Sequence, residues 1–322
     1  MKAAVLTGFG GPEVVRIAQR PTPKIKPEQV LVKLHASTVN SGDARIRSKN
    51  VPKGFGFIMS LVFGFNTPRK EILGTVFAGE VIEFGANVTG FKTGDMIYGS
   101  TEMKMGAHAE FVAIKASDAI APLPKGLDPA EAASLVFGGT TAMFFIDKSG
   151  LGSGQRVLVN AAAGSVGLAI TQIASAKGAH VTAIASARNH EFLRKMGADE
   201  VIDYKTTDLR RLNQKFDVVA DCLGTLPFAR HRHLLVKGGR FAQITGTLCE
   251  MLTAPFQSAL SPYKIVGGTA LATKTSLEAL SKLAEAGTLA PVIDKTFAFE
   301  DIQQAYTHVD TGHKRGNVVL AH

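Results

Sequence analysis

The sequence has few cysteines, and we find no apolar run in it long enough to cross a lipid bilayer. Cys222 and Cys249 are the only cysteines in 322 residues, so we expect no disulfide framework and a cytoplasmic location. The chain starts with a short apolar stretch that passes at once into a glycine-rich turn, which is not typical of a secretory signal peptide. We therefore expect no membrane among the partners of this protein.

A basic patch interleaved with aromatic side chains is also lacking. The formal net charge is +9, yet Lys and Arg are scattered, with modest clusters at residues 45–53, 69–70 and 230–232. Proteins that bind single-stranded nucleic acid combine cations with aromatic stacking platforms, so nucleic acid is not an expected partner. We interpret the charge as solvated surface charge that also suits a phosphate-rich cofactor.

The most informative feature present is an apolar run that leads through a turn of small residues into a helical pattern. Residues 157–159 are all apolar, and the turn reads Ala162-x-Gly164-x-x-Gly167. The first N–H groups of a helix are unpaired and its dipole favours anions, so such a turn suits a pyrophosphate. Gly164 would let the backbone approach the phosphates, and Gly167 would let the helix pack closely on the strand. Taken alone the motif is weak, because plain packing turns look the same.

Strands dominate the first part of the chain, and strands alternate with helices after residue 155. Strands are expected at residues 30–36, 75–82, 94–99, 109–114, 156–159, 181–186, 201–204, 216–221, 239–244 and 263–270. Helices are expected from Pro129, after an Asp128 N-cap, and at residues 166–177, 191–196, 208–212, 228–236 and 276–286. The alternation predicts an α/β fold with a doubly wound parallel sheet, a Rossmann domain. We place this dinucleotide-binding domain at 125–290, and a discontinuous, mostly β catalytic domain at 1–124 and 291–322.

The residues after the second strand of the βαβ unit indicate which dinucleotide is bound. An acidic residue there would accept hydrogen bonds from the ribose of NAD, but this chain has Ser186 and Arg188. A small hydroxyl followed by a guanidinium leaves room and positive charge for a 2′-phosphate, and Lys205 could add to that charge. We therefore predict NADPH (NADP) as the cofactor.

One segment, residues 54–65 (GFGFIMSLVFGF), is apolar, glycine-rich and flanked by cations. A membrane-surface element is conceivable, but a lid or wall over an apolar pocket is the favoured interpretation at this length.

Taken together, the chain resembles the zinc-free quinone oxidoreductase branch of the medium-chain dehydrogenase/reductase family. The resemblance runs from end to end, through VNSGD at 39–43, GTVFAGE at 74–80, FGGTTA at 137–142, MGADEVIDY at 196–204 and GHKRGNVVL at 312–320. It implies a GroES-like, partly open barrel as the catalytic domain, with the cofactor in the cleft between domains. It also implies a homodimer that pairs the strand near residues 265–268.

The turn and the resemblance together give the candidate site residues. Those expected to bind the cofactor are Asn40, Thr141, Ala163, Gly164, Ser165, Val166, Gly167, Ser186, Arg188, Tyr204, Gly224, Ile244, Thr245 and Asn317. Tyr204 could equally be packing at the sheet edge. Catalytic candidates are Asn40, whose amide could donate to a carbonyl oxygen, Asp43, which could instead fix its loop, and Tyr263, a candidate proton donor that could also be half-buried structure.

Metal chemistry is not expected. The resemblance places the zinc ligands of related enzymes around residues 39–40 and 75–76, where no Cys or His stands, and no cysteine precedes Cys222. A site built from His108 with Glu110 is the remaining alternative. We predict an enzyme that transfers hydride from NADPH to quinones or α,β-unsaturated carbonyl compounds. A zinc-free NAD(P)-dependent alcohol dehydrogenase, or a non-catalytic regulatory protein that binds NADPH or RNA, are the alternatives.

Overall fold

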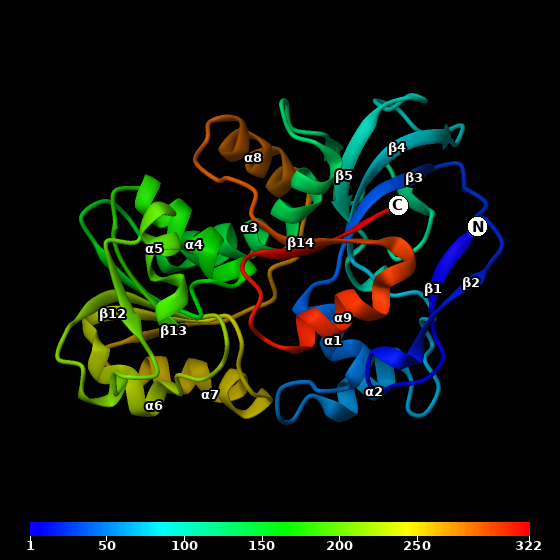
Figure 1. The fold of residues 1–322 in the computed structure, drawn as a ribbon. Coiled ribbons are helices and arrows are strands. Elements are labelled where there is room, and N and C mark those ends of the chain that lie inside the picture. Colours follow the sequence, from blue (N-terminus) through cyan, green and yellow to red (C-terminus); the bar gives the residue numbers. More distant parts are fainter. The chain divides into compact units, whose positions relative to one another are not determined.

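The computed structural model describes all 322 residues, which divide into two compact units (Figure 1). Unit 1 comprises Met1–Val51, Gly56–Phe137 and Leu271–His322, and unit 2 comprises Pro52–Phe55 and Gly138–Ala270. The sequence placed the domain limits after residues 124 and 290, whereas the contacts divide the chain after residues 137 and 270. The first of these limits lies inside helix α3 (Pro129–Ser149), so one helix contributes to both units.

Unit 1 is built mainly from β-strands. They are β1 (Lys2–Leu6), β2 (Val15–Gln19), β3 (Gln29–Thr38), β4 (Val76–Phe84), β5 (Met96–Ser100), β6 (Phe111–Lys115), β7 (Ile120–Pro122), β14 (Ile293–Ala298) and β15 (Asn317–Ala321). Seven of them form one sheet in the order β14-β15-β3-β4-β5-β7, with β6 also paired to β3, while β1 and β2 pair with each other. β15 runs antiparallel to β3, so the last strands of the chain return to the first domain as predicted.

The helices of unit 1 are α1 (Ser41–Ser48), α2 (Gly56–Phe63), α8 (Lys274–Glu285) and α9 (Ile302–Asp310), with the 3₁₀ helices η1 (Pro12–Val14), η2 (Glu102–Lys104) and η6 (Phe299–Asp301). α9 lies beside α1 and β15. Ile302, Ala305, Tyr306 and Val309 recur at helical spacing on α9 and are buried, because they pack into one apolar cluster with Val318 and Leu320 of β15.

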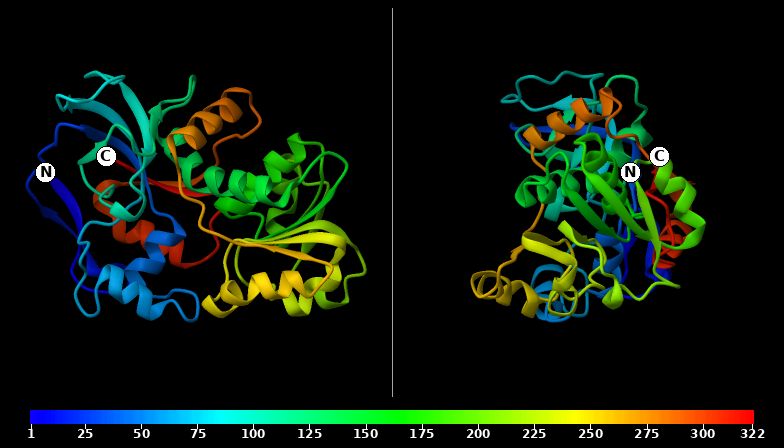
Figure 2. Two further views of the ribbon diagram at one scale, coloured as in Figure 1. Left: turned by 180° about the vertical axis from the view of Figure 1, so that it is seen from behind. Right: turned by 90° about the vertical axis from the view of Figure 1, so that its left-hand side faces the viewer.

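Unit 2 is a doubly wound parallel sheet, as predicted. Its strands are β8 (Arg156–Asn160), β9 (His180–Ala185), β10 (Glu200–Asp203), β11 (Phe216–Asp221), β12 (Leu235–Gln243) and β13 (Lys264–Val266), in the order β10-β9-β8-β11-β12-β13. Its helices besides α3 are α4 (Ser165–Ala176), α5 (His190–Lys195), α6 (Phe228–His231) and α7 (Leu248–Ala259), with η3 (Ala187–Asn189), η4 (Leu209–Arg211) and η5 (Arg232–Leu234). Figures 1 and 2 show α4 and α5 on one face of this sheet and α6 and α7 on the other.

Three predicted elements differ from the structure, and one helix of unit 2 was not predicted. The helix expected at 208–212 is the 3₁₀ helix η4, and the one at 228–236 ends early because β12 begins at Leu235. The strand expected at 263–270 is limited to the three residues of β13. Helix α7 was not predicted, although Thr247 and Glu250 form a capping box at its start. Pro255 inside α7 is the physical reason for the omission, because proline usually breaks a helix.

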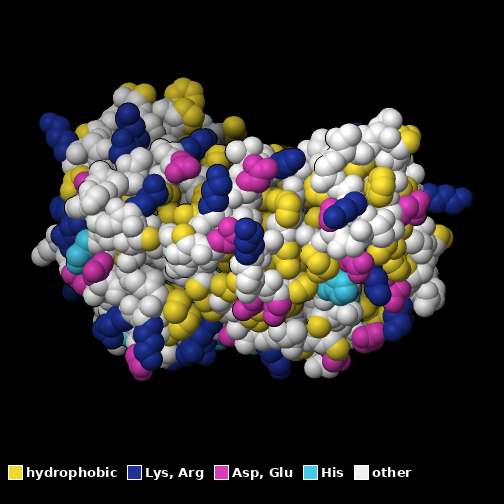
Figure 3. Space-filling model, turned by 90° about the horizontal axis from the view of Figure 1, so that it is seen from above, with side chains coloured by type: hydrophobic (Ala, Val, Ile, Leu, Met, Phe, Trp, Pro, Cys, Tyr) yellow, Lys and Arg dark blue, Asp and Glu magenta, His cyan; other side chains and the backbone are white.

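Helix α3 is long and apolar enough to cross a membrane by length and composition alone, whereas no such apolar run was expected from the sequence. However, 61% of its most apolar window is buried inside the fold, as in a core helix. Asp128 and Glu131 cap its start reciprocally, as the sequence predicted for Asp128. On the face drawn in Figure 3, Lys and Arg side chains are interspersed with Asp and Glu.

Candidate functional site

The predicted cofactor residues of unit 2 gather at one edge of its sheet. Parallel strands all end at the same edge, and the strand order reverses between β8 and β11, the point at which doubly wound sheets bind ligands. The loops at this carboxyl edge carry residues 163–167 after β8, Ser186 and Arg188 after β9, Tyr204 after β10, Gly224 after β11, and Ile244 and Thr245 after β12.

The turn after β8 is tightly built. Ala161 has a φ of 55°, a left-handed conformation that is uncommon for a residue with a side chain. Its carbonyl oxygen accepts a hydrogen bond from the Gly164 N–H at 3.1 Å, and α4 begins immediately afterwards. No side chain caps the N-terminus of α4, because Gly164 occupies the N-cap position. This is the arrangement that suits an anion at a helix start.

The two glycines of the motif have different roles. A Cβ on Gly167 would lie 2.5 Å from the Ala161 carbonyl oxygen and 2.8 Å from the Ala162 Cα, so only glycine lets α4 pack this closely on β8. A Cβ on Gly164 would meet only that carbonyl oxygen, at an ordinary 3.5 Å. Glycine at 164 is therefore not required by packing, and the side where a Cβ would stand is open apart from that oxygen. This supports the role that the sequence predicts for Gly164, close approach of a phosphate.

Asp221, the last residue of β11, organises the centre of this edge and is 2% exposed. Its carboxylate accepts hydrogen bonds from the Asn160 side chain at 2.7 Å, and from the N–H groups of Leu223, Gly224 and Leu226 at 3.2, 2.9 and 2.9 Å. Its carbonyl oxygen accepts from Ile244 and Thr245. One residue thus connects the loops after β8, β11 and β12. Asp221 was not predicted as a site residue, although a carboxylate at the end of an apolar strand was a signal in the sequence.

The loops after β9 and β10 present the residues predicted to select the cofactor. Arg188 lies in η3 and is exposed, and Ser186 is the residue before η3. Tyr204 follows β10 and is 49% exposed. These positions at the edge of the sheet agree with a site for the adenosine half of a dinucleotide, where a guanidinium would bind a 2′-phosphate.

In unit 1, Asn40 is the N-cap of α1 and uses both ends of its amide. Its Oδ1 accepts from the N–H groups of Gly42 and Asp43 at 2.8 and 3.0 Å, and its Nδ2 donates to Thr75 Oγ1 at 2.9 Å. Asp43 completes the capping box by accepting from the Asn40 N–H at 3.0 Å. The orientation of the Asn40 amide is therefore fixed by the start of α1 and by the loop before β4.

Asp43 is fully buried, and its Oδ1 has no hydrogen-bond partner. Burial raises the pKa of Asp43 to about 7, and hydrogen bonds from the backbone of Asn40 and Gly74 oppose the shift. Burial also raises the pKa of Tyr306, an effect that the nearby Asp43 charge reinforces. A carboxyl group in this position exchanges its proton near neutral pH.

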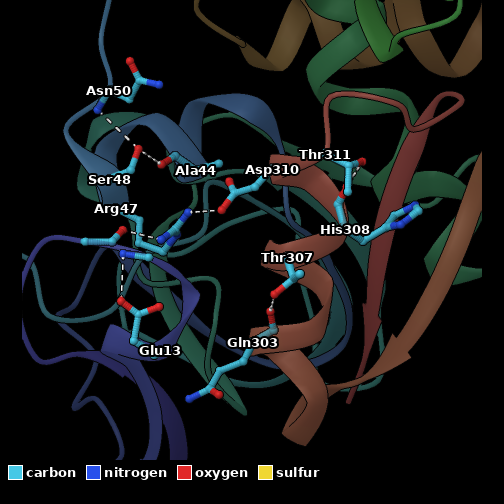
Figure 4. Close-up of polar contacts among 12 residues, drawn as sticks. Glu13, Ala44, Arg47, Ser48, Asn50, Gln303, Thr307, His308, Asp310 and Thr311 are labelled. Atoms are coloured by element: carbon cyan, nitrogen blue, oxygen red, sulfur yellow. Dashed lines mark hydrogen bonds and ion pairs between the residues drawn. The ribbon is translucent and has the colours of Figure 1, made fainter.

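A buried polar cluster continues from Asp43 toward α9. Burial lowers the pKa of His108 to about 4, so its ring is neutral near pH 7. Its Nε2 donates to the Thr38 carbonyl at 3.0 Å, and its Nδ1 then accepts from the Tyr306 hydroxyl at 3.4 Å. Figure 4 shows Arg47 of α1, which is 1% exposed, bonded to Asp310 of α9 at 2.5 Å. Arg47, Asp310 and Tyr306 were not predicted from the sequence. The only signal was the helical spacing of Tyr306 with Ile302 and Val309, which places Tyr306 on the buried face of α9.

The last three predicted residues, Tyr263, Asn317 and Thr141, belong to other elements. Tyr263 precedes β13, at the amino ends of the strands, and its ring contacts Phe228 edge-on with centroids 6.3 Å apart. This is the half-buried packing that was the alternative for Tyr263, and the structure does not bring it to the carboxyl edge. Asn317 begins β15 in unit 1, where its side chain donates to the Val292 carbonyl at 3.1 Å. Thr141 lies within α3, on the part assigned to unit 2.

The donor set for a metal ion is not present. No three or more His, Cys, Asp or Glu side chains in the 322 residues stand where they could hold a metal together. His108 and Glu110 do not form a pair: the His108 ring bonds Thr38 and Tyr306, while Glu110 accepts from the Lys2 N–H at 2.6 Å. The residues therefore do not fit a zinc site.

Comparison with known proteins identifies the family. Residues 26–125 match the alcohol dehydrogenase GroES-like domain, and residues 196–320 match a family described as zinc-binding dehydrogenase. A mitochondrial NAD(P)H oxidoreductase of Homo sapiens is 31% identical over 99% of this chain and 89% of its own length. A chloroplastic NADPH-dependent alkenal/one oxidoreductase of Arabidopsis thaliana is 30% identical over 99% and 79%.

Among solved structures, the quinone oxidoreductase from Coxiella burnetii is 30% identical, with a TM-score of 0.89 over 100% of this chain and 99% of that one. The order of the domains, the doubly wound sheet and this end-to-end likeness agree with one another. The chain therefore belongs to the medium-chain dehydrogenase/reductase family, in its quinone oxidoreductase branch.

Proposed function

We propose that this protein is an NADPH-dependent reductase of quinones or α,β-unsaturated carbonyl compounds. The observation that carries the proposal is the carboxyl edge of unit 2. There a helix start without a side-chain cap, the open side of Gly164 and the exposed Arg188 supply what a phosphorylated dinucleotide needs. The names of the relatives, which include quinone and alkenal/one oxidoreductases, support the class of acceptor.

The residues of unit 2 would bind and orient the cofactor. Residues 163–167 would hold the pyrophosphate, with Ser186 and Arg188 at the 2′-phosphate and Tyr204 beside them. Asp221 would keep the loops that carry Gly224, Ile244 and Thr245 in place, because it hydrogen-bonds all three at their backbones. When bound, the reduced nicotinamide supplies the hydride.

In unit 1, Asn40 is the candidate donor to the acceptor's carbonyl oxygen. An amide nitrogen carries two N–H bonds, and Thr75 accepts one of them, which leaves the second for a ligand. A quinone or enone develops negative charge on oxygen during reduction, and a fixed donor stabilises it. Asp43 is assigned a positioning role, because it holds the Asn40 backbone and so the direction of that amide. Tyr263 is not retained as proton donor, so the proton would come from solvent.

The test is steady-state NADPH oxidation with a panel of small quinones and enones. Turnover on several acceptors is expected, whereas tight NADPH binding without turnover on any acceptor would mark a binding protein and refute the proposal. The variant Asn40→Ser is the sharper probe, because serine keeps the N-cap of α1 but removes the amide donor. We expect it to lower kcat by about a hundredfold. A kcat within about twofold of wild type would exclude Asn40 from this role.

We also propose a homodimer and a cytoplasmic location. β13 is an edge strand of its sheet, and an unpaired edge is a ready template for a second copy. Both cysteines are free thiols, which agrees with a reducing compartment, although the human and Arabidopsis relatives are named for organelles. Sedimentation equilibrium of the purified chain tests the dimer; a monomer at micromolar concentration would contradict it.

A further inference from the structure

The apolar segment at residues 54–65 contains helix α2 (Gly56–Phe63), which has one anchored face and one exposed face. Phe63 is buried, and Met59 packs with it against the core cluster of unit 1. The side chains of Phe57, Ile58, Leu61 and Val62 are 67%, 42%, 46% and 43% exposed. Folded proteins rarely expose several large apolar side chains side by side, and such a patch usually marks a binding surface.

The exposed side chains form one continuous surface. Positions 57, 58, 61 and 62 lie on the same side of the helix, because residues three and four apart are neighbours on a helix surface. Phe65, just past the helix and 51% exposed, extends this surface, since its ring contacts that of Phe57 edge-on with centroids 6.2 Å apart. We call these five side chains the α2 face.

The α2 face lies within a stretch of purely positive charge. Residues 44–70 contain six Lys and Arg and no Asp or Glu. Arg69 donates to the Leu61 carbonyl at 2.6 Å, and Lys49 donates to the Phe65 carbonyl, so both cations are held at the end of α2. Lys49, Arg69 and the exposed Lys70 have no carboxylate within ion-pair distance, whereas Arg47 is paired with Asp310.

Helix α7 provides an internal contrast. It too has large exposed apolar side chains, with Leu252 at 65% and Phe256 at 70%. However, residues 241–263 contain no Lys or Arg and one acidic residue, Glu250. An exposed apolar face is therefore present in both units, but only the α2 face is accompanied by cations without carboxylate partners.

We propose that the α2 face docks on the surface of an anionic lipid bilayer. The five side chains would enter the boundary between headgroups and acyl chains, with Lys49, Arg69 and Lys70 at the level of the lipid phosphates. From the sequence we favoured a lid or wall over an apolar pocket and expected no membrane partner. A lid explains the apolar face, but it does not explain why the cations around it have no carboxylates.

Sedimentation of the purified full-length chain with lipid vesicles tests this. Wild type is expected to bind vesicles of equal parts phosphatidylglycerol and phosphatidylcholine at least about tenfold more strongly than phosphatidylcholine alone. Raising the salt to about 0.5 M should weaken that binding, because the charges are then screened. The double variant Phe57→Ser, Leu61→Ser should bind the mixed vesicles at least about tenfold more weakly than wild type. The double variant Arg69→Gln, Lys70→Gln should lose its preference for phosphatidylglycerol.

The matched control is Leu252→Ser with Phe256→Ser on α7, which removes apolar groups that are at least as exposed and should bind mixed vesicles as wild type does. Thermal melts verify that every variant is folded. Failure of wild type to bind the mixed vesicles, or equal losses from the α2 and α7 variants, would overturn the proposal. So would an α2 variant that binds vesicles normally but loses NADPH-dependent turnover, since that result identifies a lid.

Discussion

Asp43 of unit 1 and Asp221 of unit 2 are both buried carboxylates, but very different numbers of donors reach them. Four hydrogen bonds end on the Asp221 carboxylate, from one side chain and three backbone N–H groups. Asp43 accepts two hydrogen bonds, from the backbone of Asn40 and of Gly74, and its Oδ1 has no partner. Burying a charge is costly unless hydrogen bonds replace the lost water. Asp221 therefore acts as a structural brace, whereas Asp43 remains a group that can gain or lose a proton.

The largest expected effect comes from removing the brace. Asp221→Ala would remove the acceptor of three backbone N–H groups, those of Leu223, Gly224 and Leu226. It would also remove one of the two acceptors of the Asn160 amide, which keeps its hydrogen bond to Thr225 Oγ1. Hydrogen bonds to a charged group contribute about 1.5–3 kcal/mol each and are not additive, so we expect a loss on the order of 5 kcal/mol in the free energy of unfolding. Urea denaturation measures it. Asp217→Ala is the control on the same strand, because Asp217 accepts a single backbone bond, from Arg156. Equal losses in the two variants would contradict the distinction.

The next effect concerns the pH dependence that Asp43 produces. Its folded-state pKa, about 7, lies above the unfolded value near 3.8, so its contribution to stability is complete below about pH 4 and is lost as the pH rises to about 7. The full difference is on the order of 4 kcal/mol. Asp43→Asn cannot ionise, so it should match wild type near pH 4 and become the more stable protein near pH 8. Melting both proteins across this range tests the sign. A stability difference that does not change with pH would show that Asp43 does not titrate between these values.

A smaller effect should separate the two glycines at the edge that Asp221 braces. The Cβ of Gly164→Ala has room in the protein, so this variant should keep its melting temperature but bind NADPH at least about tenfold more weakly. Gly167→Ala meets backbone atoms at 2.5 Å and should instead lower the melting temperature. Calorimetric titration with NADPH and thermal melts measure the two properties independently. If Gly164→Ala binds NADPH like wild type, the phosphates do not approach this turn.

The two carboxylates also show which features of the fold and of the site can be predicted from the sequence. The glycine turn and the alternation of strands and helices were predictable, because each depends on local pattern. Asp43 was named only through the family resemblance, and nothing in its neighbours indicated an oxygen without a partner. Asp221 and the pair Arg47 and Asp310 join segments far apart in the chain, at separations such as 263 residues, which no local pattern records. The exposed face of α2 could not be predicted either, because apolar composition does not reveal which face of a helix is covered by the rest of the chain.

The smallest expected effect, and the most specific, concerns Arg188. If the edge braced by Asp221 binds NADPH, then Arg188→Ala should remove one charge-assisted contact to the 2′-phosphate and leave the rest of the site intact. We expect the ratio of NADPH to NADH affinity to fall about tenfold, equivalent to about 1.4 kcal/mol, with NADH affinity unchanged. Arg194→Ala is the matched control, because Arg194 is also an exposed arginine and lies on the following helix, α5. Titrations with both cofactors at low ionic strength measure the ratio. If both variants lower NADPH affinity equally, the general positive charge attracts the cofactor; if neither changes the ratio, another residue selects it.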